Sequence, residues 1–386
     1  MSIRLIHTAD VHLDLCYAHA GMTPVQANNR RQSLRDSLRT VVRRAGEWPA
    51  DALLIAGDLF EHHRVSRDTI AFLKDAFDRI PDVAVFIAPG NHDPYTPDSP
   101  YATESWPGNV TVFTEPRWQS KEVSHALLTV HGFAFDGPDI SENPFGQLSV
   151  PEDNGRVHAA VGHGSAATHQ PPDKGAYAPF DPAQAAAPGL AYLALGHFHT
   201  MTELEGNFPT RMCYSGAPEG HGFRECGPRY FLEIEIDEGR PRVRQQASAH
   251  SIYEQHTLDV STFSNSQAVL EAVRDLPAQG GEAARLLRIV LEGACPPSMQ
   301  ERLAALPDVV GDQFAYLDIV DRTAPQEDYE DLASEATSLG VFIQQMNDAI
   351  AAAEEPERRR MLERARHVGL AAYRGEMVPV RGTEGG

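Results

Sequence analysis

The chain has 386 residues, of which 42% are hydrophobic, so it is long enough to bury the cores of two or three domains. No apolar stretch is long enough to span a membrane and no basic leader precedes the first apolar run, so we expect a cytoplasmic protein without a membrane anchor. The net charge of -21 weighs against a broad basic surface for nucleic acid, and the four cysteines have no spacing typical of a zinc site or a disulfide framework.

Five short apolar runs predict the buried strands of an α/β protein. They are rich in Val, Ile, Leu and Ala, which is typical of strands covered on both faces. Segments 31–46 and 67–79 have helical spacing and lie between the first three runs, which predicts a β-α-β-α-β start. A later run, Phe231–Ile236, alternates apolar and acidic residues as an edge strand does. The five runs are Ile3–Thr8, Asp51–Ala56, Val83–Ala88, Val157–Val161 and Leu190–Leu195.

A residue of a metal-binding type follows each of these runs. Loops at the carboxyl ends of such strands form the ligand-binding edge of layered α/β proteins, so these residues are expected to converge in space. A glycine beside most of them allows the backbone to turn sharply off the sheet. The motifs, in chain order, are Asp10-Val11-His12, Gly57-Asp58, Gly90-Asn91-His92-Asp93, Gly162-His163 and Gly196-His197-Phe198-His199.

This set of carboxylates, imidazoles and one amide predicts a two-metal hydrolase. Hydrolysis of a phosphoester requires a nucleophile at neutral pH and stabilisation of negative charge, and two cations about 3.5 to 4 Å apart supply both. Asp58 stands alone in its loop and is the predicted bridge between them. The mixed donors suit Mn²⁺, Fe²⁺ or Zn²⁺ rather than a closed thiolate zinc site. One ion is assigned to Asp10, His12 and His199, and the other to Asn91, His163 and His197.

His92 is left free beside Asn91 to donate a proton to the leaving oxygen. Taken alone, most of the motifs also have an ordinary explanation, because Asp-x-His, Gly-Asp and Gly-Asn-His-Asp occur in solvated loops and tight turns. Taken in this order, they favour the metal site. Most of the other histidines are expected to be packed or surface groups, among them His7, His125, His131, His158, His169 and His221.

The ordered motifs resemble the calcineurin-like metallophosphoesterases over about the first half of the chain. A narrower likeness is to the SbcD branch of DNA-repair exonucleases, whose eukaryotic and archaeal members are called meiotic recombination eleven. The segments that carry this likeness are Ile6–Asp14, Gly57–Phe60 followed by Arg64-Val65-Ser66, and Tyr214–Pro218 running on to Phe223-Arg224-Glu225.

The resemblance implies a four-layer α/β/β/α metallophosphoesterase sandwich with a small α/β capping domain and a C-terminal helical hairpin. It implies a manganese-dependent DNA nuclease, an exonuclease with endonuclease activity, in which the seven residues assigned above bind metal and His92 is the acid. It also implies an SMC-like ATPase partner and a homodimer, as parts of an SbcCD-like DNA repair complex.

One position departs from the family pattern. Many members place a histidine directly after the Gly-Asp-Leu-Phe stretch to orient the phosphate or the acid, whereas this chain has Glu61 there. An anionic side chain repels a phosphodiester unless it turns away. The phosphate contact is therefore expected from His62, His63 or Arg64 instead.

The chain is predicted to divide into four parts. Residues 1–250 form the nuclease domain, and residues 251–324 form the capping domain, in the order strand, helix, strand, helix, strand. Residues 325–376 form the hairpin, with an unbroken apolar stripe from Leu332 to Ile350 and a second helix from Pro356. It is expected to fold back on the capping domain or to dock on the ATPase. Residues 377–386 are a predicted disordered tail.

Three functions stay open from the sequence. The leading hypothesis is a DNA nuclease, and the arginine-rich helix at 31–46 is then a solvated face, a groove flank or a dimer contact. The second is a phosphodiesterase for a small nucleotide or another small phosphodiester, which the acidic charge favours. The third is a weakly active structural subunit, suggested only by Glu61.

Overall fold

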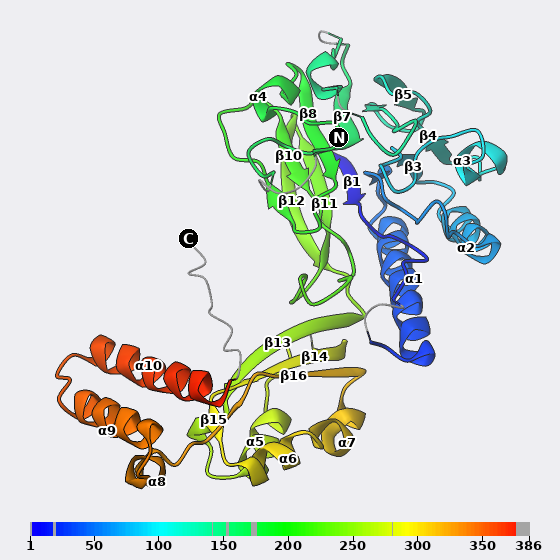
Figure 1. Ribbon diagram of the computed structural model, residues 1–386. Helices are drawn as coiled ribbons and strands as arrows, with labels where there is room; N and C mark the ends of the chain where they lie inside the picture. Colours follow the sequence, from blue (N-terminus) through cyan, green and yellow to red (C-terminus); the bar gives the residue numbers. More distant parts are fainter. Residues whose placement is uncertain are drawn as a thin grey trace. The chain divides into compact units, whose positions relative to one another are not determined.

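The computed structural model describes residues 2–17, 21–140, 142–151, 154–170, 176–279 and 281–375. Its first sheet has six strands in the order β12-β11-β1-β2-β3-β4 (Figure 1). Strands β1 to β4 run parallel, and the predicted β-α-β-α-β start is confirmed. The elements are β1 Ile3–Thr8, α1 Pro24–Glu47, β2 Ala52–Ile55, α2 Arg67–Asp78, β3 Ala84–Ile87, α3 Pro100–Thr103, β4 Val110–Val112, β11 Tyr230–Asp237 and β12 Arg240–Ala247.

The expectation that Phe231–Ile236 forms an edge strand is wrong. This run is β11, which pairs with β1 on one side and with β12 on the other, so β12 is the edge. Its acidic residue Glu233 does not face water but forms an ion pair with Arg44 of α1 and is 3% exposed. In this strand, the acidic residue Glu233 therefore belongs to a polar contact with a helix and not to a solvated face.

The second sheet also has six strands, in the order β5-β6-β7-β8-β10-β9. Strands β6, β7, β8 and β10 run parallel, while β5 and β9 are antiparallel edges. Two of the predicted runs, β7 and β8, lie at its centre. The elements are β5 Gln119–Val123, β6 Leu128–Gly132, η1 Phe145–Gln147, β7 Val157–His163, α4 Pro182–Ala185, β8 Leu190–Gly196, β9 Thr202–Glu203 and β10 Arg211–Tyr214.

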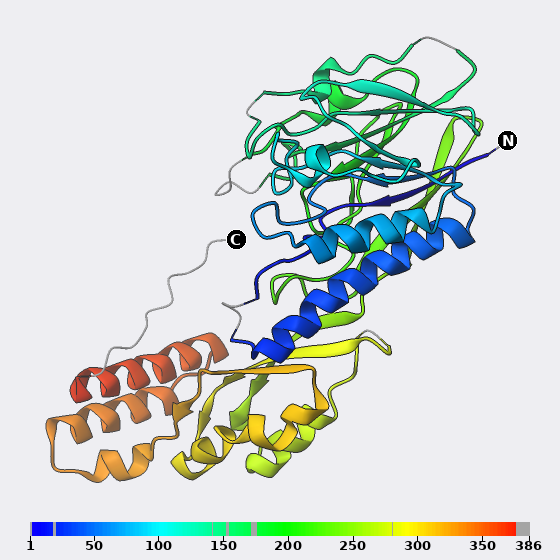
Figure 2. The ribbon, with the colours of Figure 1, turned by 90° about the vertical axis from the view of Figure 1, so that its right-hand side faces the viewer.

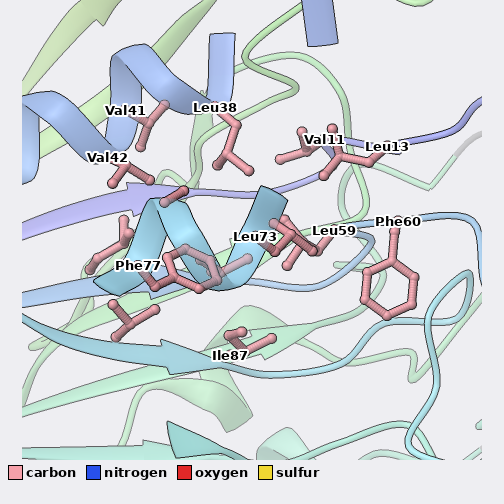
Figure 3. Close-up of a cluster of buried hydrophobic side chains, with 14 of the residues drawn as sticks. Val11, Leu13, Leu38, Val41, Val42, Leu59, Phe60, Leu73, Phe77 and Ile87 are labelled. Atoms are coloured by element: carbon pink, nitrogen blue, oxygen red, sulfur yellow. The ribbon is translucent and has the colours of Figure 1, made fainter. Parts of the chain in front are cut away.

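Three buried clusters separate the layers. The first lies between the first sheet and helices α1 and α2 (Figure 2). Leu38 and Val41 of α1 and Phe77 of α2 belong to it (Figure 3). The second lies between the two sheets and includes Leu54 and Val161. The third lies on the outer face of the second sheet, which is covered by η1, α4 and aromatic residues of the loops. The predicted sandwich of two sheets between helices is confirmed.

Helix α1 does not present all its arginines to solvent. Arg39 and Arg43 are exposed, in agreement with the predicted solvated face. Arg30, by contrast, is 3% exposed and donates to Glu219 Oε1 over 2.7 Å. The arginine run therefore also has a structural role inside the fold.

Residues beyond β12 form a small third sheet with the order β13-β14-β16. The predicted alternation of strands and helices matches it, except that the second predicted helix is split into α6 and α7. The elements are β13 Ser251–Asp259, η2 Val260–Thr262, α5 Ser266–Arg274, β14 Ala284–Glu292, β15 Ala294–Cys295, α6 Pro297–Leu303, α7 Leu306–Val310, η3 Gly311–Gln313, β16 Tyr316–Asp321 and β17 Ala324–Pro325.

The C-terminal helices are α8 Tyr329–Ser334, α9 Ser338–Ala351 and α10 Pro356–Arg374. The helix start at Pro356 is confirmed, but the stripe from Leu332 to Ile350 is not one helix. It breaks before α9, where the Thr337 side chain accepts from Gly340 N–H and caps the new helix. Helices α9 and α10 lie side by side, with the Phe342 and Tyr373 ring centroids 5.8 Å apart (Figure 1).

The chain divides into two compact units. One comprises residues 1–258, 270–290 and 306–320, and the other comprises 259–269, 291–305 and 321–386. The division at 250/251 and 324/325 stays a prediction, and the predicted tail at 377–386 lies outside the described residues. Among the described helices, none combines the length and the apolarity that crossing a bilayer requires.

Candidate metal centre

The predicted ligands lie where strands of both large sheets end. Asp10 follows β1, Asp58 follows β2, and His197 follows β8 directly. These three residues and His12 all have positive φ, at 54°, 53°, 111° and 50° respectively. Residues other than glycine rarely adopt a positive φ, because the side chain clashes with the backbone. Such strained residues are common at functional sites, where the surrounding fold enforces the conformation.

Asp58 is at the centre of the group. Its Oδ2 lies 3.4 Å from His163 Nε2 and 3.6 Å from His12 Nε2, while its Oδ1 accepts from the His92 N–H over 2.9 Å. Burial opposes its ionisation, but the neighbouring His163 and His12 lower the pKa of Asp58 below its usual value. Asp58 therefore faces both predicted ligand sets as an anion.

Two glycines are required by this close packing. A Cβ on Gly90 would lie 2.4 Å from Asp58 Oδ1, and one on Gly196 would lie 1.8 Å from the Ala56 carbonyl oxygen. Both contacts are shorter than any side chain tolerates. The glycines of the sequence motifs therefore permit the loops to approach one another, in addition to allowing turns.

Two side-chain oxygens, Asn91 Oδ1 and Asp58 Oδ2, lie close to one ring nitrogen of His163. His163 Nδ1 donates to the Ala56 carbonyl over 2.9 Å, which leaves Nε2 with a lone pair. That Nε2 lies 3.0 Å from Asn91 Oδ1 and 3.4 Å from Asp58 Oδ2. Acceptors gathered in a buried site without a donor between them repel one another, and a cation removes that repulsion.

Asp10, which the sequence assigned to the ion of His12 and His199, also lies close to this side of the centre. Ligand atoms of Asp10, Asp58 and His163 all lie within 4.8 Å of one another. Burial raises the pKa of Asp10 to about 8, an effect that His199 opposes. The Asp10 carboxylate also accepts from the His197 N–H over 3.0 Å, which fixes the start of the Gly-His-Phe-His loop.

His12 and His199 form the other side. His12 Nδ1 is bonded to Glu61 Oε1 and His199 Nδ1 to Glu225 Oε1, both over 2.7 Å. A carboxylate on one ring nitrogen orients the other nitrogen toward a metal and raises its basicity. His12 Nε2 is buried and has no hydrogen-bond partner among the described residues. These residues fit a second divalent ion.

Glu61 is not among the described residues that line the pocket at this centre. Its two oxygens are bonded to His12 Nδ1 over 2.7 Å and to His92 Nδ1 over 3.2 Å. The hydrogen bond to Glu61 raises the pKa of His92 to about 9, so this imidazole carries its proton at neutral pH in the metal-free protein. The residue that departs from the family pattern thus orients one predicted ligand, His12, and the predicted acid, His92.

Asp93 has a role that the sequence did not reveal. It accepts from the backbone N–H groups of Asp58, Leu59 and Gly90, and from the Tyr101 hydroxyl, over 2.7 to 2.9 Å. It therefore ties the Gly-Asp loop to the Gly-Asn-His-Asp loop. Its place in the latter motif was the only signal available.

The expectation that His221 is a packed or surface group without a role is incomplete. Its ring lies beside those of His12 and His199, with centroids 5.0 and 4.9 Å away. Ligand atoms of these three imidazoles all lie within 4.8 Å of one another. The signal was a further Gly-His pair, Gly220-His221, but it does not directly follow an apolar run.

A pocket of about 700 Å³ opens onto this centre. His62, His63 and Arg64 are not among the described residues that line it; His63 and Arg64 are exposed, and His62 Nε2 lies 3.7 Å from Asp98 Oδ2. A larger pocket of about 1150 Å³ lies over α1 and α2, away from the predicted ligands. The pocket of about 700 Å³ is lined by Asp58, Asn91, His92, His169, Gln170, Tyr177, His197, Phe198, His199, Thr200, Thr202, Arg224 and Glu225.

The loop that carries His221 and Glu225 is anchored by the buried pair of Arg30 and Glu219. Replacing Glu219 with alanine is expected to lower the free energy of unfolding of the metal-free protein by about 3 to 5 kcal/mol, because it leaves the Arg30 charge buried and unpaired. Urea denaturation measures this. The control is Glu47→Ala, which breaks an exposed pair with Arg43 on the same helix and should cost about 0.5 kcal/mol or less. Equal losses would contradict the proposed anchor.

The comparisons with known proteins agree with this geometry. The model of the calcineurin-like phosphoesterase family matches residues 3–201. The chain is similar to the uncharacterized metallophosphoesterase YhaO of Bacillus subtilis (strain 168), at 26% identity over 309 residues that cover 78% of this chain and 74% of that protein. It is also similar to the DNA double-strand break repair protein Mre11 of Methanopyrus kandleri, at 25% identity over 265 residues. That match covers 63% of this chain and 52%, about half, of the archaeal protein.

Proposed function

We propose that this chain, which belongs to the calcineurin-like phosphoesterase family, is a two-metal phosphodiesterase that acts on DNA as a nuclease. The observation that carries the proposal is the position of Asp58. Its Oδ2 lies within 3.6 Å of a nitrogen from each predicted ligand set, His163 on one side and His12 on the other. A carboxylate in this position can bridge two cations.

Divalent ions in this centre would activate a water molecule and neutralise charge on the phosphoryl oxygens. Manganese is the first candidate, with iron or zinc as alternatives. Other residues of the chain orient the predicted ligands and the predicted acid. Glu61 and Glu225 fix the rings of His12 and His199. Asp93 fixes the backbone on which Asp58 and His92 lie. His92, protonated through its bond to Glu61, is placed to give a proton to the leaving oxygen.

The similarity to a DNA double-strand break repair protein supports DNA as the substrate. The net charge of -21 opposes this choice, but binding depends on where charges lie. Arg224 is the only arginine or lysine among the described residues that line the pocket, and it is exposed. We assign to it the contact with a backbone phosphate.

Replacing Arg224 with alanine is expected to raise the KM for DNA by about 10-fold with little change in kcat, since a charge-assisted contact of about 1.5 kcal/mol is lost. Steady-state kinetics on labelled duplexes measure both constants. The comparison variant is Arg64→Ala, which removes an exposed arginine that does not line the described pocket. A larger effect of Arg64→Ala would favour the contact predicted from the sequence.

The main test is hydrolysis by the purified chain with Mn²⁺. The substrates are end-labelled single- and double-stranded DNA, a cyclic nucleotide and a generic phosphodiester. Release of mononucleotides from DNA ends indicates exonuclease activity, and cleavage of a circular strand indicates endonuclease activity. Turnover of the cyclic nucleotide far faster than DNA would instead establish a small-molecule phosphodiesterase.

The small-molecule alternative is favoured by the acidic net charge and by a pocket of about 700 Å³, a size that encloses a nucleotide. The third hypothesis, a weakly active structural subunit, is no longer supported by the one sequence feature that suggested it. Glu61, which suggested it, is bonded to His12 and His92 and does not point at the substrate pocket. Failure to hydrolyse any phosphodiester, with the ATPase present, would restore that alternative.

The helical hairpin is proposed to bind an SMC-like ATPase subunit, within a homodimeric repair complex. Apolar side chains of α9 and α10 that remain largely exposed support a partner: Val341 at 59%, Met361 at 64% and Tyr373 at 53%. The alternative is that the hairpin only folds back on the capping domain. Co-purification with an ATPase encoded nearby, with and without Met361→Glu, separates the two.

A further inference from the structure

We propose that His221 is a ligand of the ion held by His12 and His199, so that three imidazoles rather than two surround that ion. The inference rests on the proposed two-metal function and adds a residue to it. His221 lies beyond the stretch 3–201 that the family model matches. Its assignment therefore comes from the geometry of this chain.

The three rings are arranged around a common point. The planes of His12 and His221 meet at 82° and those of His199 and His221 at 90°, with centroids about 5 Å apart in both pairs. One ligand atom from each ring lies within 4.8 Å of the other two. Edge-to-face packing alone does not require a nitrogen of each ring to approach those of the other two, whereas ligands of one ion must do so.

The second observation is an unsatisfied nitrogen. His221 Nε2 is buried and has no hydrogen-bond partner among the described residues, and the same holds for His12 Nε2. Buried polar atoms are nearly always paired, because leaving them unpaired is unfavourable. Two such nitrogens on adjacent rings are explained together by one cation that both of them bind.

The loop holds His221 in place as firmly as a ligand requires. Its backbone N–H donates to Glu225 Oε2 over 2.9 Å, and the other oxygen of that carboxylate accepts from His199 Nδ1 over 2.7 Å. On the other side, Arg30 donates to the Gly220 carbonyl over 2.6 Å while it is paired with Glu219. One glutamate and one arginine thus set the distance between the rings of His199 and His221.

The extra imidazole changes the metal that this position prefers. Nitrogen-rich sites favour Zn²⁺, Co²⁺ and Fe²⁺ over Mn²⁺, while oxygen donors suit Mn²⁺. The side formed by Asp10, Asp58, Asn91 and His163 offers three oxygen donors and one nitrogen, whereas His12, His199 and His221 on the other side offer three nitrogens. The two positions are therefore expected to select different ions.

The test is metal binding to the full chain, measured without any substrate. Isothermal titration and the visible spectrum with Co²⁺ compare the wild type with His221→Ala and His221→Gln. Of the two Co²⁺ sites, the one with the higher affinity is expected to bind Co²⁺ about 10- to 100-fold more weakly in both variants. The affinity for Mn²⁺ should change less. The matched control is His131→Ala, which removes another buried imidazole, one bonded to Ser120 and His158 away from the centre; it should leave Co²⁺ affinity unchanged.

X-ray absorption of the wild type loaded with one equivalent of Zn²⁺ gives a readout that needs no variant. Three coordinated imidazoles are expected, and two would overturn the proposal. Unchanged Co²⁺ affinity in folded His221→Gln, or saturation at three equivalents, would also overturn it. Because binding is measured apart from hydrolysis, a chain that binds two ions but cleaves no DNA refutes the nuclease function and leaves the assignment of His221 standing.

Discussion

Asp58→Asn is expected to lower DNA hydrolysis by at least about 1000-fold and to remove one of two bound metal equivalents, since about 4 kcal/mol of charge stabilisation is lost with the bridging carboxylate. Asparagine has the same shape and can still accept from the His92 N–H. The fold should therefore persist. The measurements are turnover on labelled duplex DNA with saturating Mn²⁺ and metal content after desalting.

The control for this variant is Asp98→Asn. Asp98 is a carboxylate of a nearby loop with an 81% exposed side chain, 3.7 Å from His62 and in contact with none of the predicted ligands. It should retain full activity and both equivalents of metal. If Asp58→Asn kept two ions and most of its turnover, Asp58 would not be a bridge and the two-metal proposal would fail.

The strands, and the convergence of the residues that follow them, could be predicted because both depend on local sequence. Buried parallel strands are continuous apolar runs, and the residues that follow them lie at one edge of a sheet whatever the rest of the chain does. Runs such as Ile3–Thr8 and Leu190–Leu195 were therefore located to within a residue. The glycines reinforced this, since Gly90 and Gly196 have no room for a side chain.

The features that escaped prediction depend on partners far along the chain. Glu233 looked like part of a solvated edge because its partner, Arg44, lies 189 residues away. His221 looked ordinary because its loop is positioned by Arg30, which belongs to the first helix. No local pattern reveals such contacts. They become visible only when helix α1 packs against strands and loops from the later part of the chain.

The direction in which a side chain points is a second feature that could not be predicted from the sequence. A glutamate at position 61 suggested repulsion of the phosphate, since its orientation could not be derived from the sequence. The carboxylate instead binds two imidazoles and raises the pKa of His92 to about 9. The glutamate that suggested a weaker site from the sequence thus raises the pKa of the predicted acid, His92.

His92→Ala is expected to leave both metal affinities within about 3-fold of the wild type and to lower turnover of DNA by about 100- to 10,000-fold, the usual contribution of a general acid. The reason is that the leaving sugar oxygen is a strong base and needs a proton. A nitrophenyl phosphodiester has a weakly basic leaving group, so its hydrolysis should fall far less. The ratio of the two losses is the measurement that separates an acid from a ligand.

His92→Gln provides the matched control, because it keeps a polar side chain of similar size but cannot deliver a proton as an imidazolium does. It should behave like His92→Ala on DNA and like the wild type on the activated ester. Equal losses on both substrates, together with weaker metal binding, would show that His92 binds an ion with His12 and Glu61, the third group whose ligand atoms lie within 4.8 Å of one another. The acid would then have to be sought elsewhere among the residues of the pocket, and His169 is the next imidazole that lines it outside the predicted ligands.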